Sequence, residues 1–261
     1  MAAFNSRKNR RESAKLSLWG TSAIHARSPV MVALWSMAFP GYGHLLLNKY
    51  IRGYALISWE FFINQETNLN QAMIYTFTGS FSNATSILNL NYLYLYIPIY
   101  LFSIWDSYRS TVEMNNIYYL DKKRKKMVEV QVISPFEINY LEKRKPLVAV
   151  LWSMAVPGLG QFYLNHIFSA LFALIMTLLI VHYSHFLEAF HLLLLGDIAG
   201  STAMVDPQWL LYLPSLYFFN IYESHTRSVE NNKLFEMEQQ RFLKQRYQGP
   251  AFRVKKGRWV N

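Results

Sequence analysis

Two stretches of this 261-residue chain are near copies of each other. Residues 29–48 and 146–165 align at an offset of 117 with 11 identities in 20 positions. Residues 100–115 and 217–232 align at the same offset with seven identities. A fixed period of this kind indicates one structural unit that is used twice. The sequence therefore predicts two tandem copies with the same elements in the same order.

Each copy contains three apolar stretches, and the chain as a whole is 52% hydrophobic and only 16% charged. Ordinary soluble domains contain about 25% charged residues. The stretch from Ile167 to Tyr183 is apolar on every face, which is typical of a helix surrounded by lipid or by a large core. We therefore expect an all-α integral membrane protein, with a soluble helical bundle as the alternative. The apolar stretches are 29–47, 50–63 and 90–105 in the first copy, and 146–164, 167–183 and 209–222 in the second.

The basic residues are confined to a few segments of the chain. All but two of the 26 Lys and Arg lie in residues 1–28, 106–146 and 223–261, whereas residues 65–90 and 184–208 contain none. Because Lys and Arg mark the cytoplasmic side of a membrane protein, the three basic segments are expected inside and the other two outside. Residues 29–63 must then cross an odd number of times, although they contain two apolar stretches.

A Pro-Gly motif in the middle of the first apolar stretch of each copy explains this odd number. Proline removes a backbone donor and glycine permits a reversal of the chain. Each copy is therefore expected to be a Pro-Gly-broken hairpin, re-entrant or interfacial, followed by two transmembrane helices, which gives parallel repeats. Six full crossings are the alternative, and they would place the lysine-rich linker outside. The turn residues are Pro40, Gly41, Gly43, Pro157, Gly158 and Gly160.

These observations divide the chain into five parts. We expect two membrane repeats, separated by a charged cytoplasmic linker and flanked by basic cytoplasmic tails, so that both termini lie in the cytoplasm. The parts are a tail at 1–28, a repeat at 29–115, a linker at 116–145, a repeat at 146–232 and a tail at 233–261.

The second motif, LWSMAVPGLGQFYLN, resembles a widespread group of small bacterial multi-pass membrane proteins that carry a Pro-Gly-x-Gly-Gln-x-Tyr turn between apolar segments. Gln161 and Tyr163 match the pattern together with Pro157, Gly158 and Gly160, whereas the first copy has His44 and Leu46 at the positions of Gln and Tyr. The likeness covers about 30 residues of each copy. It implies a helix-turn-helix membrane module in a bacterial cell membrane, and it implies no single activity.

Few polar residues stand in or next to the apolar stretches. Glu60 falls inside a predicted span, where an ionisable residue is a functional candidate. His44 and Gln161 follow the Pro-Gly breaks, so that these three residues are candidates for a polar pathway. Asp106 and Arg109 are three apart and Glu223 and Arg227 four apart, spacings that allow ion pairs on one helix face at the inner membrane surface.

Metal binding and catalysis have weak support in the sequence. His182, His185, Glu188 and His191 are spaced by three on a predicted helix, but at 100° per residue they fan out, so that two or three at most could share a metal. The chain contains no cysteine. It also lacks a nucleophile with a neighbouring base, a phosphate-binding glycine loop and paired catalytic carboxylates. We therefore expect no enzyme activity, no metal and no cofactor.

The net charge of +10 leaves nucleic acid or anionic lipid as partner. Since the basic residues flank apolar stretches, the bilayer with its anionic inner-leaflet lipids is the better match, and no nucleic acid is expected. The long charged segments favour a non-enzymatic scaffold or accessory subunit that contacts other membrane proteins. A small-solute or ion transporter or channel with its pathway at the Pro-Gly breaks is the alternative.

Overall fold

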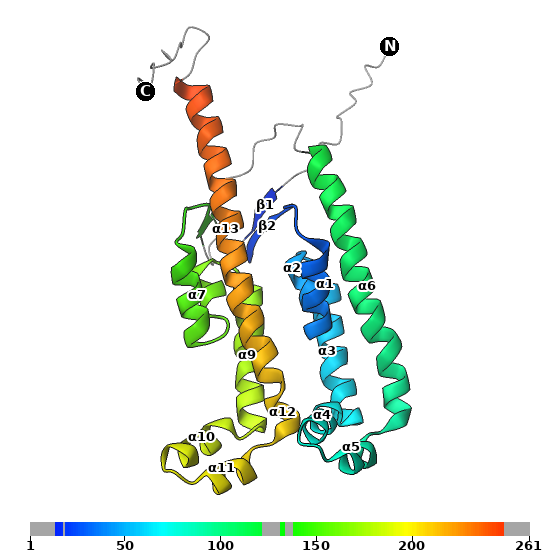
Figure 1. Ribbon diagram of the computed structural model, residues 1–261. Coiled ribbons are helices and arrows are strands. Elements are labelled where there is room, and N and C mark those ends of the chain that lie inside the picture. Colours follow the sequence, from blue (N-terminus) through cyan, green and yellow to red (C-terminus); the bar gives the residue numbers. More distant parts are fainter. Residues whose placement is uncertain (1–13, 18, 122–130, 134–137, 248–261) are drawn as a thin grey trace, which may run out of the picture.

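The computed structural model describes residues 14–17, 19–121, 131–133 and 138–247. The described chain is mostly helical, which confirms the predicted helical character of the fold. Two long helices, α6 (Leu90–Asp121) and α13 (Tyr212–Tyr247), dominate the structure. Both run from the lower to the upper end of the molecule in Figure 1, and the shorter helices lie around their lower parts.

The first half begins with a broken helical hairpin. Ser28 caps α1 by accepting a hydrogen bond from the backbone N–H of Met31, and Pro29 stands at the first helical position. The chain then turns at Gly41, which has a φ of 101°. Asn68, with a φ of 54°, ends the following long helix. The helices of this half before α6 are α1 (Pro29–Ala38), α2 (Tyr42–Leu46), α3 (Tyr50–Thr67), α4 (Leu69–Phe77) and α5 (Phe81–Ile87).

The second half has the same order of helices at the same offset of 117 residues. Its hairpin turns at Gly158 with a φ of 105°, and its apolar helix ends before His185, which has a φ of 52°. The equivalent of α6 is divided at Leu211 into a short α12 and the long α13. The helices before α13 are α7 (Pro146–Ala155), α8 (Leu159–Tyr163), α9 (Ile167–Tyr183), α10 (Phe186–Leu194), α11 (Ile198–Met204) and α12 (Pro207–Leu210).

Several segments that the sequence assigns to loops or tails have regular structure. The expected outer segments 65–90 and 184–208 contain α4, α5, α10 and α11. The last helix continues through the expected C-terminal tail as far as Tyr247, and α6 enters the linker as far as Asp121. The charged patch at residues 122–126 lies outside the described residues.

Two short antiparallel β-hairpins, which the sequence analysis does not predict, stand at the basic end. β1 (Ala14–Ser17) pairs with β2 (Gly20–Ala23), and β3 (Gln131–Ile133) pairs with β4 (Ile138–Tyr140). Leu16, Leu141 and Leu234 form a small buried cluster there, which fastens the hairpins to α13. Strands of three or four residues give too short an alternation to be read from sequence.

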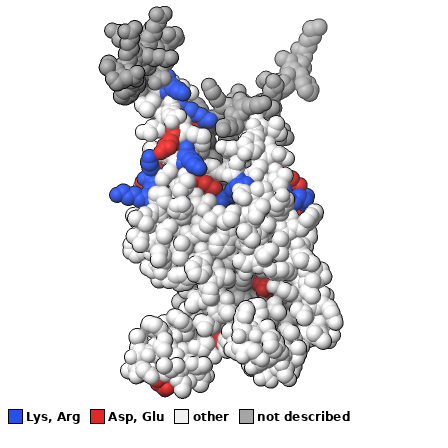
Figure 2. All heavy atoms as spheres, viewed as in Figure 1, with Lys and Arg blue, Asp and Glu red and all other residues white. Residues whose placement is uncertain are grey.

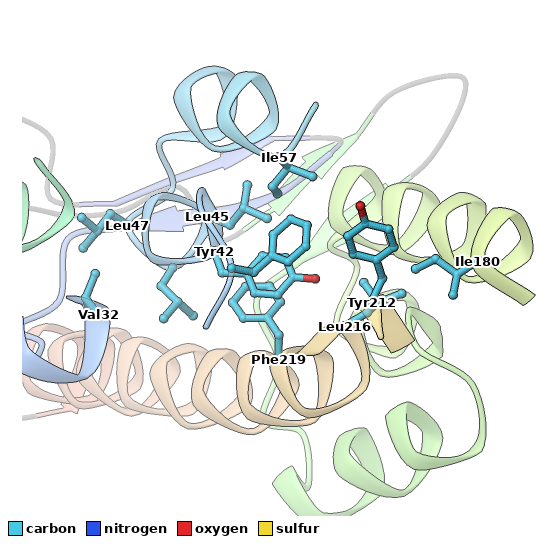
Figure 3. Close-up of a cluster of buried hydrophobic side chains, with 11 residues drawn as sticks. Val32, Tyr42, Leu45, Leu47, Ile57, Ile180, Tyr212, Leu216 and Phe219 are labelled. Atoms are coloured by element: carbon cyan, nitrogen blue, oxygen red, sulfur yellow. The ribbon is translucent and has the colours of Figure 1, made fainter. Parts of the chain in front are cut away.

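The main core lies between the two halves. Tyr42 of α2 stacks on Phe219 of α13 with ring centroids 4.1 Å apart, and on Phe39 with centroids 4.8 Å apart. Figure 3 shows Tyr42, Leu45 and Ile57 of the first half facing Phe219 and Leu216 of the second. The hairpin of the first half therefore contributes to a core that it shares with the second half.

Charge is separated along the molecule. Residues 53–108 and 146–226 contain no Lys or Arg, and Figure 2 shows the basic side chains gathered in the upper part of the visible face. Taken singly, none of the described helices combines the length and hydropathy that crossing a membrane requires. Two pairs joined at a sharp bend meet that requirement together, namely α5 with α6, bent by 90°, and α9 with α10, bent by 61°.

Candidate functional site at the two hairpin tips

The turn after each Pro-Gly motif is built on glycine for two separate reasons. Gly41 and Gly158 have positive φ angles, a conformation that side chains rarely adopt. Gly43 and Gly160 instead lie against the preceding helix. A Cβ at Gly43 would overlap the side chain of Ser36 and the carbonyl of Val32, and a Cβ at Gly160 would overlap the equivalent Ser153 and Ala149. The glycines thus allow the two arms of each hairpin to touch.

The polar residue of the first hairpin tip bonds to the acid of the long helix. His44 Nε2 lies 3.1 Å from Asp106 Oδ2, and both side chains are buried. Arg109 Nη2 donates to Asp106 Oδ1 at 2.7 Å, and Arg52 Nη1 to Asp106 Oδ2 at 3.1 Å. The two arginine side chains are 44% and 58% exposed. Asp106 therefore connects the hairpin, α3 and α6 at the edge of the structure.

The second hairpin tip makes the equivalent bond with different residues. Gln161 Nε2 donates to Glu223 Oε2 at 3.2 Å, and Arg227 Nε donates to Glu223 Oε1 at 2.7 Å. Arg227 also reaches the first half, where it donates to Asn48 Oδ1 at 2.7 Å and to the carbonyl of Leu45 at 3.0 Å. Only 2% of the Arg227 side chain is exposed. This cation is thus buried between the halves, with hydrogen bonds to oxygens and the ring of Tyr50 centred 5.8 Å from its Cζ.

The structure brings together residues that the sequence analysis treats apart. From the sequence, His44 and Gln161 are candidates for a polar pathway. Asp106 and Glu223 are candidates for ion pairs at the membrane surface. Each pathway candidate is hydrogen-bonded to one of these acids, at equivalent positions of the two halves. A bond between a hairpin tip and a helix 62 residues later has no signature in local spacing. The recurrence of a polar residue and an acid at the same offset is the signal that could have found it.

Each half also has a polar clamp at the entry to its hairpin that the sequence analysis missed. Asn115 Nδ2 donates to the carbonyl of Arg27 at 2.8 Å, and its Oδ1 accepts from the N–H of the same residue at 2.9 Å. Asn232 and Arg144 repeat both bonds at 2.7 and 2.8 Å. The amide thus fixes the chain just before the first helix of the hairpin. The alignment of Asn115 with Asn232 was the available signal.

Glu60 belongs to a different polar cluster. Its Oε1 accepts from Asn64 Nδ2 at 3.2 Å and from the hydroxyl of Tyr96 at 3.4 Å. Asn64 in turn bonds to Gln208 of the second half, whose Nε2 donates to Asn64 Oδ1 at 2.8 Å. This cluster joins the halves at the end of the molecule opposite to the basic one. Among the described residues, Glu60 forms hydrogen bonds with neither His44 nor Gln161.

The histidines on the second half do not share one helix. The chain turns at His185, which has a positive φ, and this turn separates α9 from α10. His182 therefore lies at the end of α9, whereas Glu188 lies on α10. In the part of the chain that the structure describes, no three His, Asp or Glu side chains are placed to hold a metal ion. The expectation of one continuous helix through this segment is therefore wrong, because the turn reorients the side chains.

The interior between the hairpin tips is closely filled. The cavity bordered by Tyr42, Asn220 and Glu223 has a volume of about 10 Å³. A space of this size holds about one water molecule. The stacked rings of Tyr42 and Phe219 occupy the centre. The arrangement is suited to holding two hairpins against two long helices.

No protein-family model, curated protein or solved structure matches the chain.

Proposed function

We propose that the chain is a multi-pass protein of a bacterial cytoplasmic membrane that acts as a non-enzymatic scaffold or accessory subunit. The observation that best supports a membrane location is that charged and polar side chains are buried while many large apolar side chains are exposed. His44, Asp106, Gln161, Glu223 and Arg227 are buried, whereas large apolar side chains cover the outside. Soluble proteins rarely expose continuous apolar surface, while lipid-facing helices require it.

The exposed apolar residues follow one face of each outer helix. On α9 they include Leu171, Ile175 and Leu178, the last of which is 69% exposed. On α7, Leu147, Leu151 and Met154 follow the same spacing of four and then three residues. This spacing places each set in a single stripe. Hydrocarbon in contact with these stripes removes the cost of hydrating them.

The lengths of the helices can be compared with the thickness of a bilayer. At about 1.5 Å per residue, the 18 residues of α3 and the 17 of α9 rise about 26 Å, close to a hydrocarbon core of about 30 Å. The 10 residues of α1 and of α7 rise about 15 Å, or half of it. We propose that α1 with α2, and α7 with α8, are re-entrant hairpins, and that the two halves are parallel repeats.

Labelling of single cysteines tests this topology. Because the chain contains no cysteine, Ser82→Cys, Ala203→Cys and Lys244→Cys each introduce one reactive thiol at an exposed position. We expect a membrane-impermeant maleimide to label Ser82→Cys and Ala203→Cys on intact cells, and Lys244→Cys only after permeabilisation. Labelling of Lys244→Cys from outside would contradict the proposed orientation.

The polar contacts at the hairpin tips support a scaffold rather than a transporter. His44 and Gln161 are hydrogen-bonded to Asp106 and Glu223, Glu60 belongs to a separate cluster, and the cavity beside Glu223 has a volume of only about 10 Å³. The end of α13 instead carries Phe242, Leu243 and Tyr247 on its exposed surface. An exposed helix that mixes apolar and charged residues is suited to docking against another helix.

A pair of variants separates the scaffold from the transporter. In a scaffold, Phe242→Ala with Leu243→Ala should remove most of a partner that co-purifies with the wild type from cross-linked native membranes, with normal abundance of the chain itself. Gln239→Ala with Gln240→Ala, on exposed residues of the same helix, is the matched control. An unchanged set of partners, together with loss of solute flux in Glu60→Gln, would overturn the scaffold in favour of the transporter.

A further inference from the structure

A cavity of about 430 Å³ opens at the basic end of the molecule, where the first half meets the second. It is bordered by the segment that leads into α1, by Tyr118 near the end of α6 and by Tyr222 and the following turns of α13. Pockets that bind small molecules have volumes of about 300 to 1,000 Å³. The cavity is therefore large enough for a polar headgroup.

The wall of this cavity is held in place by Arg27. The backbone of Arg27 is clamped to Asn115 on α6, and its guanidinium donates to Glu230 Oε2 on α13 at 2.7 Å. The two side chains are only 9% and 14% exposed. This wall of the cavity is therefore fixed by hydrogen bonds to both long helices. A groove between flexible side chains would have no such fixed wall.

The lining is basic. Arg27 and Glu230 neutralise each other, and Glu230 is the only acidic residue of the lining, so that Lys233 gives the cavity a net positive charge. His225, which is also on α13, adds an exposed imidazole ring to the lining. His25 Nε2 is buried and has no hydrogen-bond partner among the described residues. Burial lowers the pKa of His25, so that its ring is uncharged at neutral pH and serves as a hydrogen-bonding group.

Apolar and aromatic side chains complete the lining. Met31 and Val32 lie on the first turn of α1, where the chain enters the proposed membrane, and Tyr118 and Tyr222 stand on the two long helices. A ligand here meets Lys233 and the hydrogen-bonding histidines on one side and the start of a hydrophobic surface on the other. A phosphate bound to a glycerol and two acyl chains has this pattern of polarity.

We propose that this cavity binds the phosphate headgroup of an anionic membrane lipid, with Lys233, His225 and His25 facing the phosphate. The lipid source rests on the proposed membrane location, whereas the phosphate chemistry rests on the cavity itself. Arg27 acts as a positioning residue, since its guanidinium is engaged by Glu230. The site connects the two halves to the inner leaflet at the entry of the first hairpin.

Native mass spectrometry of the full chain, delipidated in detergent, measures this binding. We expect phosphatidylglycerol to remain bound at concentrations at which phosphatidylcholine does not. Lys233→Ala with His225→Ala should weaken the binding of phosphatidylglycerol about tenfold, whereas Lys233→Arg, which keeps the positive charge, should bind nearly as well as the wild type. Lys244→Ala, an exposed lysine farther along the same helix, should bind like the wild type.

Soluble glycerol 3-phosphate distinguishes the two sources of phosphate. Its displacement of bound phosphatidylglycerol at millimolar concentration supports a headgroup site. Binding of glycerol 3-phosphate without retention of any lipid overturns the lipid source, and equal retention of the two lipids, or equal losses in the Lys233 and Lys244 variants, overturns the site. The cysteine labelling described above tests the membrane location on residues far from the cavity, so that failure of either proposal is recognised separately.

Discussion

Replacing Glu223 with Ala is expected to lower the free energy of unfolding by about 3–5 kcal/mol, because it leaves a buried cation without its counter-ion. The guanidinium of Arg227 is 2% exposed, and Glu223 is the carboxylate that pairs with it at 2.7 Å. The other hydrogen bonds of Arg227, to Asn48 and Leu45, are to neutral oxygens, and the nearby ring of Tyr50 is also uncharged. Denaturant unfolding of the purified chain in one detergent measures the change.

The first half supplies the matched comparison for this variant. Asp106 is at the equivalent position, but its partners Arg52 and Arg109 are about half exposed and keep much of their hydration when the carboxylate is removed. Removing Asp106 leaves the buried His44 ring without its hydrogen-bond partner, at a cost of about 1–3 kcal/mol, but it leaves no buried cation without a counter-ion. Asp106→Ala should therefore cost clearly less than Glu223→Ala. Equal losses in the two variants would contradict a special role for the buried pair.

The double variant Gly43→Ala and Gly160→Ala is expected to lower the free energy of unfolding by about 2–6 kcal/mol, since overpacking costs about 1–3 kcal/mol at each site. Each new methyl group would overlap a backbone carbonyl of the preceding helix, which cannot move without opening the hairpin. Thermal unfolding followed by circular dichroism, together with denaturant unfolding, measures the loss.

A third glycine separates the effect of contact from that of backbone conformation. Gly196 has a φ of 84° and nothing within 4 Å of its ideal Cβ. Gly196→Ala should therefore show only the cost of a left-handed alanine, about 1–2 kcal/mol. A double hairpin variant that unfolds no more easily than Gly196→Ala would show that the arms of the hairpins are not closely packed.

The outline of the helices could be predicted because it depends on short-range chemistry. The apolar stretch at 167–183 corresponds to α9, and each Pro-Gly motif stands at a break between two helices. Proline, glycine and hydropathy act on their own neighbourhood, and for that reason they can be read from the sequence.

The contacts between distant segments could not be predicted in this way. The bond of Arg227 to Leu45 joins residues 182 positions apart, and that of Asn70 to Gln208 joins residues 138 apart. Pairings of this kind arise from the packing of one half on the other, which leaves no period in the sequence. The turn at His185 was missed for a related reason, since a non-glycine residue with positive φ gives little local warning.

The position of Arg227 makes the two halves unlike partners. Arg227 donates to oxygens of Leu45 and Asn48 on the first half. The equivalent residue of the first half is Ser110, which has no guanidinium, so that the first half cannot make the same bonds to the second. Two first halves would lack this link altogether. Because both halves belong to one polypeptide, the second half always supplies the guanidinium and the first half always supplies the acceptor oxygens. The two repeats are therefore an obligate heterologous pair and not two equivalent partners.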